Sequence, residues 1–130
     1  MRPVIQQHVR FPTSPQALFR TYLDSRKHTR STGVAAKISK KTGGKFTAFA
    51  GQLEGKNLLI VTGKRIVQLW RATHWKKDEW SVLVLTFSRV RGGAQVDLVH
   101  IGVPAHDYNG VRKGWPAYYW RPWKKYFAKK

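Results

Sequence analysis

The chain has 130 residues, 42% of them hydrophobic and 13% aromatic, which fits one globular domain over residues 1–130 and excludes a disordered chain. Cysteine is absent, which excludes disulfides, thiol catalysis and thiolate metal sites, and the net charge of +19 is spread along the chain, which excludes a single basic arm. The aliphatic runs at 58–61 and 82–85 are too short for a bilayer and no secretion signal is visible, so we expect a cytoplasmic protein without a membrane span.

The N-terminal quarter predicts a strand followed by helix. Residues 3–11 alternate in polarity, as expected for a first strand. A helix then begins with Ser14 as N-cap and Pro15 in its first turn, or with a capping box formed by Thr13 and Gln16, and it ends near Asp24. The polar, basic stretch 25–32 allows one further short helical turn.

A series of short apolar segments separated by glycine-rich turns follows. We predict strands at 34–40, 45–50, 57–62, 65–73, 80–90 and 94–103, with Gly51 and Gly55 flanking a short piece between the second and third of these. Strands repeated about every ten residues with such turns indicate an antiparallel meander. The order of strand, helix, meander and terminal helix predicts an α+β domain with its helices grouped against one sheet.

The last quarter carries large aromatic side chains at helical spacing. Trp115, Tyr119, Trp123 and Phe127 follow one another in steps of four, which places them on one face of a helix. Pro116 lies within this segment, so we expect a helix start or kink there and a bend around Pro122. A helix with so many aromatic residues needs a large concave apolar surface, and the predicted sheet would provide one.

Motifs throughout the chain resemble one known family. They are Phe11-x-x-Ser14-Pro15-x-x-Leu18-Phe19, Gly43-Gly44-x-Phe46, Gly51-x-Leu53-x-Gly55, Ile66-Val67-Gln68-x-Trp70-Arg71, Trp80-Ser81, His100-x-Gly102-Val103-Pro104 and Gly114-Trp115-x-x-Tyr118-Tyr119-Trp120. Together and in this order they are similar to the activator-of-heat-shock-protein-90-ATPase homologue family of the START-like (SRPBCC) superfamily. The resemblance implies the helix-grip fold of birch-pollen-allergen-like proteins, in which a curved seven-stranded antiparallel sheet surrounds a long C-terminal helix.

The resemblance implies two kinds of function. The wider superfamily binds lipids, sterols, polyketides and other apolar molecules in a cavity under the helix, and some branches are enzymes. Eukaryotic members of the family itself stimulate a chaperone ATPase with the help of an additional N-terminal domain. Because this chain begins at its predicted first strand, we place the binding of a small hydrophobic or amphipathic ligand first and a chaperone-interacting role second.

The residues themselves give little sign of catalysis. The six acidic residues fall mostly at predicted turns and helix ends, so no converging carboxylate pair is indicated. Gly43-Gly44-Lys45 lacks the spacing of a phosphate-binding loop and predicts a hairpin turn. The five histidines show no metal-ligand pairing. We therefore predict a non-enzymatic domain with no catalytic residues, no metal and no cofactor.

The candidate ligand-binding residues are mostly aromatic. Pockets are typically apolar with a few polar groups that fix the ligand's orientation. His100 shares a strand face with Val96 and Leu98, so it is either a hydrogen-bonded core histidine or a polar anchor in the pocket. The aromatic candidates either form the pocket wall or fill the core. The full candidate set is Phe46, Trp70, Phe87, His100, Trp115 and Tyr119.

The positive charge leaves a third function open. It is either a solvated surface or a means of attracting phosphate, nucleic acid or anionic lipid. Trp120 and Trp123 stand beside Arg121, Lys124 and Lys125, and stacking combined with charge is how single-stranded nucleic acids are held without sequence readout. Non-specific binding of a polyanion is therefore the third alternative.

Overall fold

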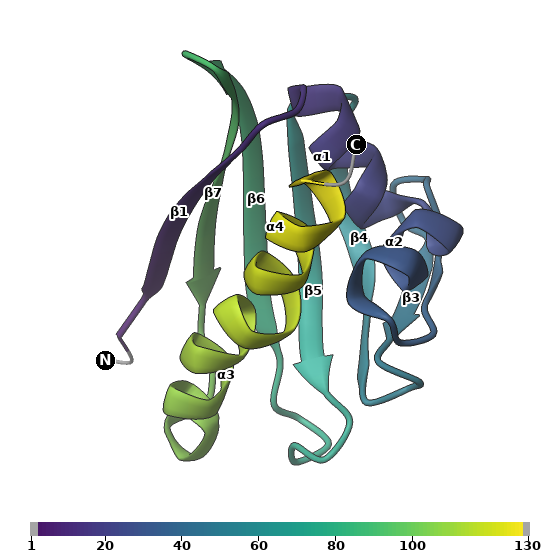
Figure 1. The fold of residues 1–130 in the computed structure, drawn as a ribbon. Coiled ribbons are helices and arrows are strands. Elements are labelled where there is room, and N and C mark those ends of the chain that lie inside the picture. Colours follow the sequence, from purple (N-terminus) through teal and green to yellow (C-terminus); the bar gives the residue numbers. More distant parts are fainter. Residues whose placement is uncertain (1–2, 129–130) are drawn as a thin grey trace.

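Seven antiparallel strands form one curved sheet in the computed structural model, which describes residues 3–128 (Figure 1). The strand order is β1-β7-β6-β5-β4-β3-β2, so the first strand pairs with the last and the other six form a meander. The predicted seven-stranded antiparallel sheet is thus confirmed. The strands are β1 (Ile5–Phe11), β2 (Lys37–Ile38), β3 (Lys45–Ala48), β4 (Leu53–Val61), β5 (Arg65–Ala72), β6 (Ser81–Val90) and β7 (Gly93–Ile101).

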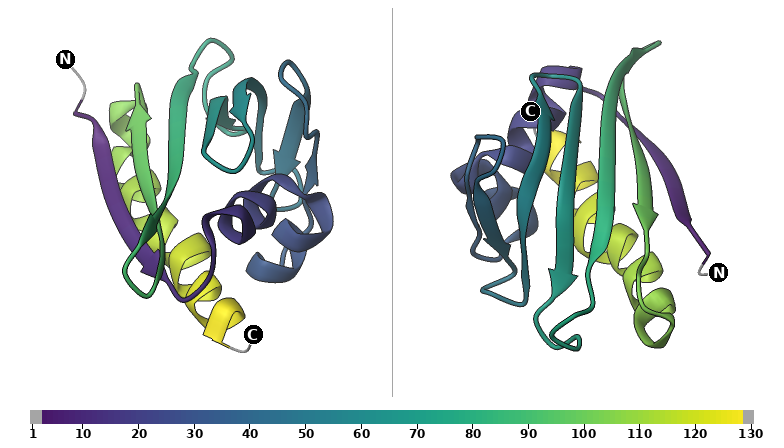
Figure 2. Two further views of the ribbon diagram at one scale, coloured as in Figure 1. Left: turned by 90° about the horizontal axis from the view of Figure 1, so that it is seen from above. Right: turned by 180° about the vertical axis from the view of Figure 1, so that it is seen from behind.

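The helices all lie on the concave face of this sheet, and the view from behind shows the strands of the convex face uncovered (Figure 2). Along β6, Leu83, Leu85 and Phe87 are buried towards the helices and alternate with half-buried residues on the convex face. The core is therefore the layer between the concave side of the sheet and the helices.

Two short helices connect β1 to the meander, and each begins with a side-chain cap. Ser14 Oγ accepts the main-chain N–H of Ala17 at 3.1 Å at the start of α1 (Pro15–Leu23), so the cap is Ser14 with Pro15 in the first turn. Asp24 caps α2 (Ser25–Thr32) by accepting the N–H of Lys27 at 3.0 Å. The segment 25–32 is therefore a complete helix of eight residues, longer than the single turn we predicted.

The meander differs from prediction around its glycines. The strand expected at 34–40 shrinks to Lys37–Ile38, and β3 ends at Ala48 because the next two residues have positive φ. The strand β4 runs unbroken through Gly55, which was predicted to flank a separate piece. A Cβ there would lie 1.9 Å from the Leu69 carbonyl oxygen, so glycine allows close strand packing and does not end the strand.

The C-terminal helix changes its winding at Pro116, where we expected a helix start or kink, and then continues. After a 3-10 turn, η1 (Ala105–Asp107), it consists of α3 (Tyr108–Trp115), a π-helical stretch η2 (Pro116–Trp120) and α4 (Arg121–Ala128). The predicted kink at Pro116 is thus a wider π turn, in which the N–H of Arg121 bonds the carbonyl of Pro116. Pro122 lies in the first turn of α4, and the helix continues through it.

A glutamine on β1 compensates for the proline that starts this π turn. Pro116 has no N–H, so the carbonyl of Arg112 lacks its helical donor. Gln7 Nε2 donates to that carbonyl at 2.9 Å, and Gln7 Oε1 accepts the indole N–H of Trp120 at 2.8 Å. The first strand therefore holds the helix at its irregular turn.

Candidate functional site

A groove of about 640 Å³ runs between the C-terminal helix and the β3–β5 side of the sheet. We call it the helix groove. The helix contributes residues from Gly110 to Pro122, a span of about 18 Å at the rise of a regular helix. The opposite wall includes Leu53 on β4 and Trp70 and Ala72 on β5. Its exposed surface is mainly apolar, and its length suits an extended ligand.

The groove exists because the helix carries small residues along this side. Gly110 and Gly114, four positions apart, both line it, together with Ala117 one turn later. A Cβ on Gly114 would meet only the ring of Tyr118, at 3.5 Å, which is ordinary van der Waals contact. An added Cβ at position 114 would therefore cause no steric clash, and the glycine there leaves open space beside the helix.

The rim of the groove is formed by a turn with unusual backbone geometry. Phe49 and Ala50, between β3 and β4, have φ values of 53° and 55°, and Gly51 follows at 89°. The left-handed region costs an L-residue about 1–2 kcal/mol, so this turn is strained. This backbone conformation directs the Phe49 ring across the groove. The centroid of the ring lies 5.8 Å from that of Tyr118 and 5.4 Å from that of Tyr119.

The candidate residues divide into two groups of three. Trp70, Trp115 and Tyr119 line the helix groove. The other candidates are buried in the core outside the lining: Phe46 packs beneath Gly55, Phe87 against the edge of Phe19, and His100 behind two of the wall tryptophans.

Sequence reasoning also missed part of the wall. Phe49 and Tyr118 belong to it. The Gly110–Gly114 spacing is the sequence signal that marks the open side of the helix, whereas nothing local marks Phe49.

His100 supports the wall from behind. Trp115 Nε1–H donates to His100 Nδ1 at 3.2 Å, so the other ring nitrogen carries the proton and donates to Ser81 Oγ at 2.8 Å. The Ser81 hydroxyl in turn donates to the carbonyl of Trp70 at 2.7 Å. Burial lowers the pKa of His100 to about 3, which keeps the ring neutral and preserves this arrangement. This series of hydrogen bonds, from Trp115 through His100 and Ser81 to the main chain of Trp70, fixes the orientation of the Trp115 ring.

A second buried chain of polar groups anchors Tyr119. Its hydroxyl donates to His28 Nε2 at 2.9 Å, and His28 Nδ1–H donates to the carbonyl of Tyr22 at 2.7 Å. The Tyr22 hydroxyl donates to Gln68 Oε1 at 2.8 Å, and Gln68 Nε2 donates to Asn57 Oδ1 at 3.0 Å. Burial lowers the pKa of His28 to about 4 and raises those of both tyrosines. Uncharged, hydrogen-bonded side chains thereby connect the C-terminal helix, α1, α2 and the sheet.

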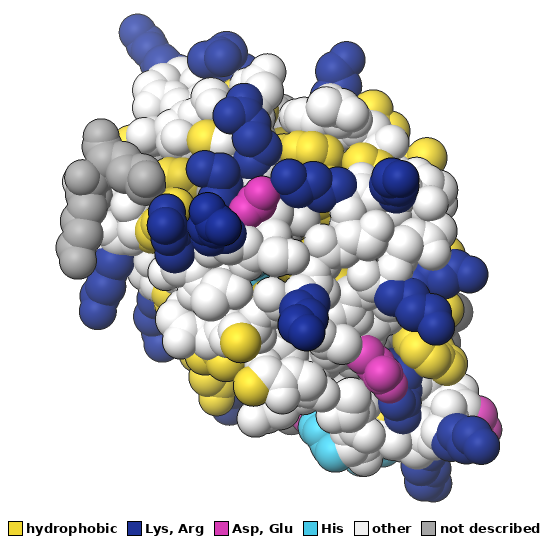
Figure 3. All heavy atoms as spheres, turned by 90° about the vertical axis from the view of Figure 1, so that its right-hand side faces the viewer, with side chains coloured by type: hydrophobic (Ala, Val, Ile, Leu, Met, Phe, Trp, Pro, Cys, Tyr) yellow, Lys and Arg dark blue, Asp and Glu magenta, His cyan; other side chains and the backbone are white. Residues whose placement is uncertain are grey.

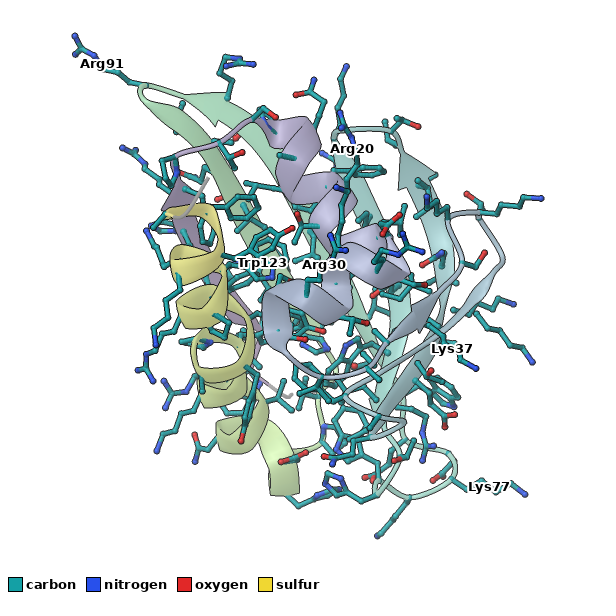
Figure 4. All side chains as sticks on the ribbon, turned by 45° about the vertical axis from the view of Figure 1, so that its right-hand side comes forward. Arg20, Arg30, Lys37, Lys77, Arg91 and Trp123 are labelled. Atoms are coloured by element: carbon teal, nitrogen blue, oxygen red, sulfur yellow. The ribbon has the colours of Figure 1, made fainter. Side chains whose placement is uncertain are left out.

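One polar group of the wall lacks a partner. Trp70 is 4% exposed, and its indole nitrogen has no hydrogen-bond acceptor among the described residues. The same holds for Trp123, which the C-terminal helix directs into the interior (Figure 4). A buried donor without an acceptor costs about 1–3 kcal/mol. Of these two only Trp70 lines the helix groove, and its indole nitrogen is closed off from the groove.

The polar groups at the two ends of the groove differ. Asp107 lines the end near α3, where its Oδ2 accepts the indole N–H of Trp75 at 2.7 Å and lies 3.4 Å from His74 Nε2. The other end is lined by Thr32 and Pro122, which carry no charge. On the face of the molecule seen in Figure 3, lysines and arginines are spread widely and acidic side chains are few.

The basic-aromatic cluster predicted for nucleic-acid stacking does not form a surface. Trp120 and Trp123 are 4% and 0% exposed, because the π turn places both against Phe11 and their neighbours in the core. Their faces are therefore closed to bases, and only the charge of the adjacent cations remains available. No helix of the described residues has the length and apolar character needed to cross a membrane.

A curved antiparallel sheet closed by a long C-terminal helix, with a groove between the two, defines a helix-grip domain of the START-like type. The model of the family described as "Activator of Hsp90 ATPase homolog 1-like protein" matches residues 12–128. The chain belongs to this family.

Named relatives agree with this assignment. The human activator of 90 kDa heat shock protein ATPase homolog 1 is 30% identical over 118 residues, which cover 91% of this chain and 35% of the human protein. The Dictyostelium discoideum homologue is 30% identical over 107 residues, 81% of this chain and 28% of that protein. The chain thus spans about a third of the length of these curated relatives.

Solved structures show the same fold. An HSP90 activator from Plasmodium falciparum superimposes with a TM-score of 0.84 at 24% identity, over 91% of both chains. A protein from Mesorhizobium loti superimposes with a TM-score of 0.85 at 16% identity, over 98% of both chains.

Proposed function

We propose that this domain binds a small apolar or amphipathic molecule in the helix groove. The observation that carries the proposal is an apolar groove of about 640 Å³ whose wall rings Trp115 and Tyr119 are held in place by buried hydrogen bonds. Apolar walls with a few oriented polar groups are typical of ligand sites. The anchored rings of Trp115 and Tyr119 would contact the apolar part of the ligand.

We also propose that the domain is not itself an enzyme. The buried histidines next to the wall have both ring nitrogens engaged, His28 with Tyr22 and Tyr119 and His100 with Ser81 and Trp115. A general base needs a free nitrogen within reach of the substrate. These histidines instead hold the wall aromatics in place.

Filling the groove tests the binding proposal. Gly114→Leu adds a side chain where a Cβ meets only ordinary contacts, and it replaces the poorest non-proline helix former with a good one, so the fold should be retained. Asn109→Leu is the matched control, since it adds the same side chain at an exposed position of α3.

The probe is N-phenyl-naphthylamine, a neutral apolar fluorophore, titrated into each variant. We expect saturable binding to the wild type and to Asn109→Leu, and binding at least tenfold weaker to Gly114→Leu. Absence of binding to the wild type, or equal binding to both variants, would refute the proposal.

Interaction with a chaperone is the second candidate, and the convex face of the sheet favours it. Cross-strand pairing aligns two rows of aliphatic residues on this uncovered face: Leu59, Val67, Val84 and Val99 in one row, and Leu69, Val82 and Ile101 in the next (Figure 2). Leu59 and Ile101 are each 45% exposed. Strands apolar on both sides are typical of sheets covered on both faces, and exposed apolar patches mark protein contacts. The names of the relatives point to a 90 kDa heat shock protein as the partner.

The ATPase rate of a purified 90 kDa heat shock protein tests this candidate. We expect the wild-type domain to raise the ATPase rate. Val84→Asp should remove this stimulation, because it places a charge in the middle of the convex face. Thr86→Asp, at the next outward-facing position of β6, should retain most of the stimulation. Equal stimulation by both variants would exclude the convex face as the contact. No stimulation by the wild-type domain would argue against the function itself.

A further inference from the structure

A second cavity adjoins the helix groove at the end lined by Thr32 and Pro122. It has a volume of about 560 Å³ and lies between the end of α2 and α4. Arg30 and Lys125 line it, and it shares Thr32 and Pro122 with the helix groove. Because α2 packs against α4 at this point, the two cavities follow one side of the C-terminal helix in succession. We call the second one the basic cavity.

The charges around the basic cavity are uncompensated. None of its lining residues is acidic, and among the described residues neither Arg30 nor Lys125 forms a salt bridge or a side-chain hydrogen bond. The acidic residue of the helix groove, Asp107, lies at the opposite end and is engaged by Trp75. The two adjoining cavities thus have a carboxylate at the far end of the helix groove, apolar walls along the groove, and in the basic cavity two cations without an ion-pair partner among the described residues.

Arg30 and Lys125 are exposed, like most of the basic residues, but they line the basic cavity. Lys37, Lys77 and Arg91 extend outward from the domain, whereas Arg30 lies on α2 beside the C-terminal helix (Figure 4). Arg30 on α2 and Lys125 on α4 line the same cavity, so an anionic group in it would be attracted by both. Such a group would be held by charge-assisted hydrogen bonds, which are stronger than neutral ones.

We propose that the ligand is an amphipathic anion, whose apolar chain lies in the helix groove and whose carboxylate or phosphate head is bound between Arg30 and Lys125. This inference rests on the proposed ligand-binding function and adds the chemical class of the ligand and its orientation. The head faces away from Asp107, since the reverse orientation would place two anions together.

The experiment compares three probes that share one apolar chain, namely dodecanoate, dodecyl phosphate and dodecanol, each titrated calorimetrically below its micelle concentration. The test variant is Arg30→Gln/Lys125→Gln. The control is Lys77→Gln/Arg91→Gln, which removes the same two charges at exposed positions far from the two cavities. Melting temperatures of both variants confirm that they are folded.

We expect the test variant to bind the two anionic probes at least tenfold more weakly than the wild type, and dodecanol equally well. The control variant should bind all three probes like the wild type. A larger loss for dodecyl phosphate identifies a phosphate head, and a larger loss for dodecanoate a carboxylate.

Unchanged affinity of the test variant for both anions, with dodecanol still bound, overturns this inference and leaves the groove function standing. Equal losses in both double variants overturn it as well, because they show an effect of net charge alone. If the wild type binds none of the probes, dodecanol included, the proposed function itself fails.

Discussion

Lowering the pH from 7.5 to 5 is expected to destabilise the fold by about 4 kcal/mol through two buried histidines. Burial lowers the pKa of His100 to about 3 and that of His28 to about 4, from an ordinary value of 6.5. The unfolded chain therefore takes up a proton at each histidine near pH 6.5, while the folded protein does not. Stability is complete above pH 6.5 and is lost as the pH falls below it, by about 2 kcal/mol for each histidine at pH 5.

Urea unfolding between pH 7.5 and 5 measures this loss. The interval lies above the range in which Asp24 and Glu79 titrate, since hydrogen bonds lower the pKa values of both. Below pH 6.5 the unfolding free energy should fall by close to 3 kcal/mol per pH unit, twice the value for one proton. His28→Gln and His100→Gln should each halve this slope, whatever they do to stability at pH 7.5.

A third variant, His8→Gln on the exposed side of β1, should leave the slope unchanged. A wild-type slope near zero in this interval would show that the buried rings take up protons in the folded state. That result would refute the neutral hydrogen-bond chains on which the description of the groove wall rests.

Three further substitutions should change the free energy of unfolding, measured by urea at pH 7.5. Gly55→Ala should cost about 3 kcal/mol, because its Cβ would lie 1.9 Å from the Leu69 carbonyl oxygen; a loss below 1 kcal/mol would show that β4 and β5 can separate there. Gln7→Ala should cost about 1–2 kcal/mol by leaving the Arg112 carbonyl and an indole without partners, and a neutral result would mean that water replaces the glutamine. Ala50→Gly should stabilise by about 0.5–1 kcal/mol, since glycine tolerates a φ of 55°, and destabilisation would contradict the strain in this turn.

Local sequence signals were reliable where they act over a few residues. Ser14 and Pro15 mark the start of α1 because a cap is made within one turn. The four-residue spacing of Trp115, Tyr119 and Trp123 correctly predicted that all three are buried. The same signals misled at Gly55, because a glycine that ends a strand and one that lets two strands approach look alike without the neighbouring strand.

The winding of the C-terminal helix depends on a residue far away in the chain. Pro116 predicts an irregular turn in the helix. Whether the helix ends there or continues as a wider turn depends on a hydrogen-bond donor for the Arg112 carbonyl. Gln7 provides that donor from β1, and the π turn buries Trp120, which we had predicted to belong to a basic-aromatic cluster open to stacking. No pattern near Pro116 contains this information.

The sequence by itself determined the order of the elements, the sheet facing a terminal aromatic helix, and the family. It could not decide which aromatic residues fill the core and which line a groove: Phe46 and Phe87 are buried in the core, whereas Phe49, which was not among the candidates, lines the groove. The physical reason is that periodicity records which side of an element is apolar, and both a core and a groove require that. Empty volume arises only where side chains from distant segments fail to meet, as beside Gly114, and their packing is decided by the tertiary structure alone.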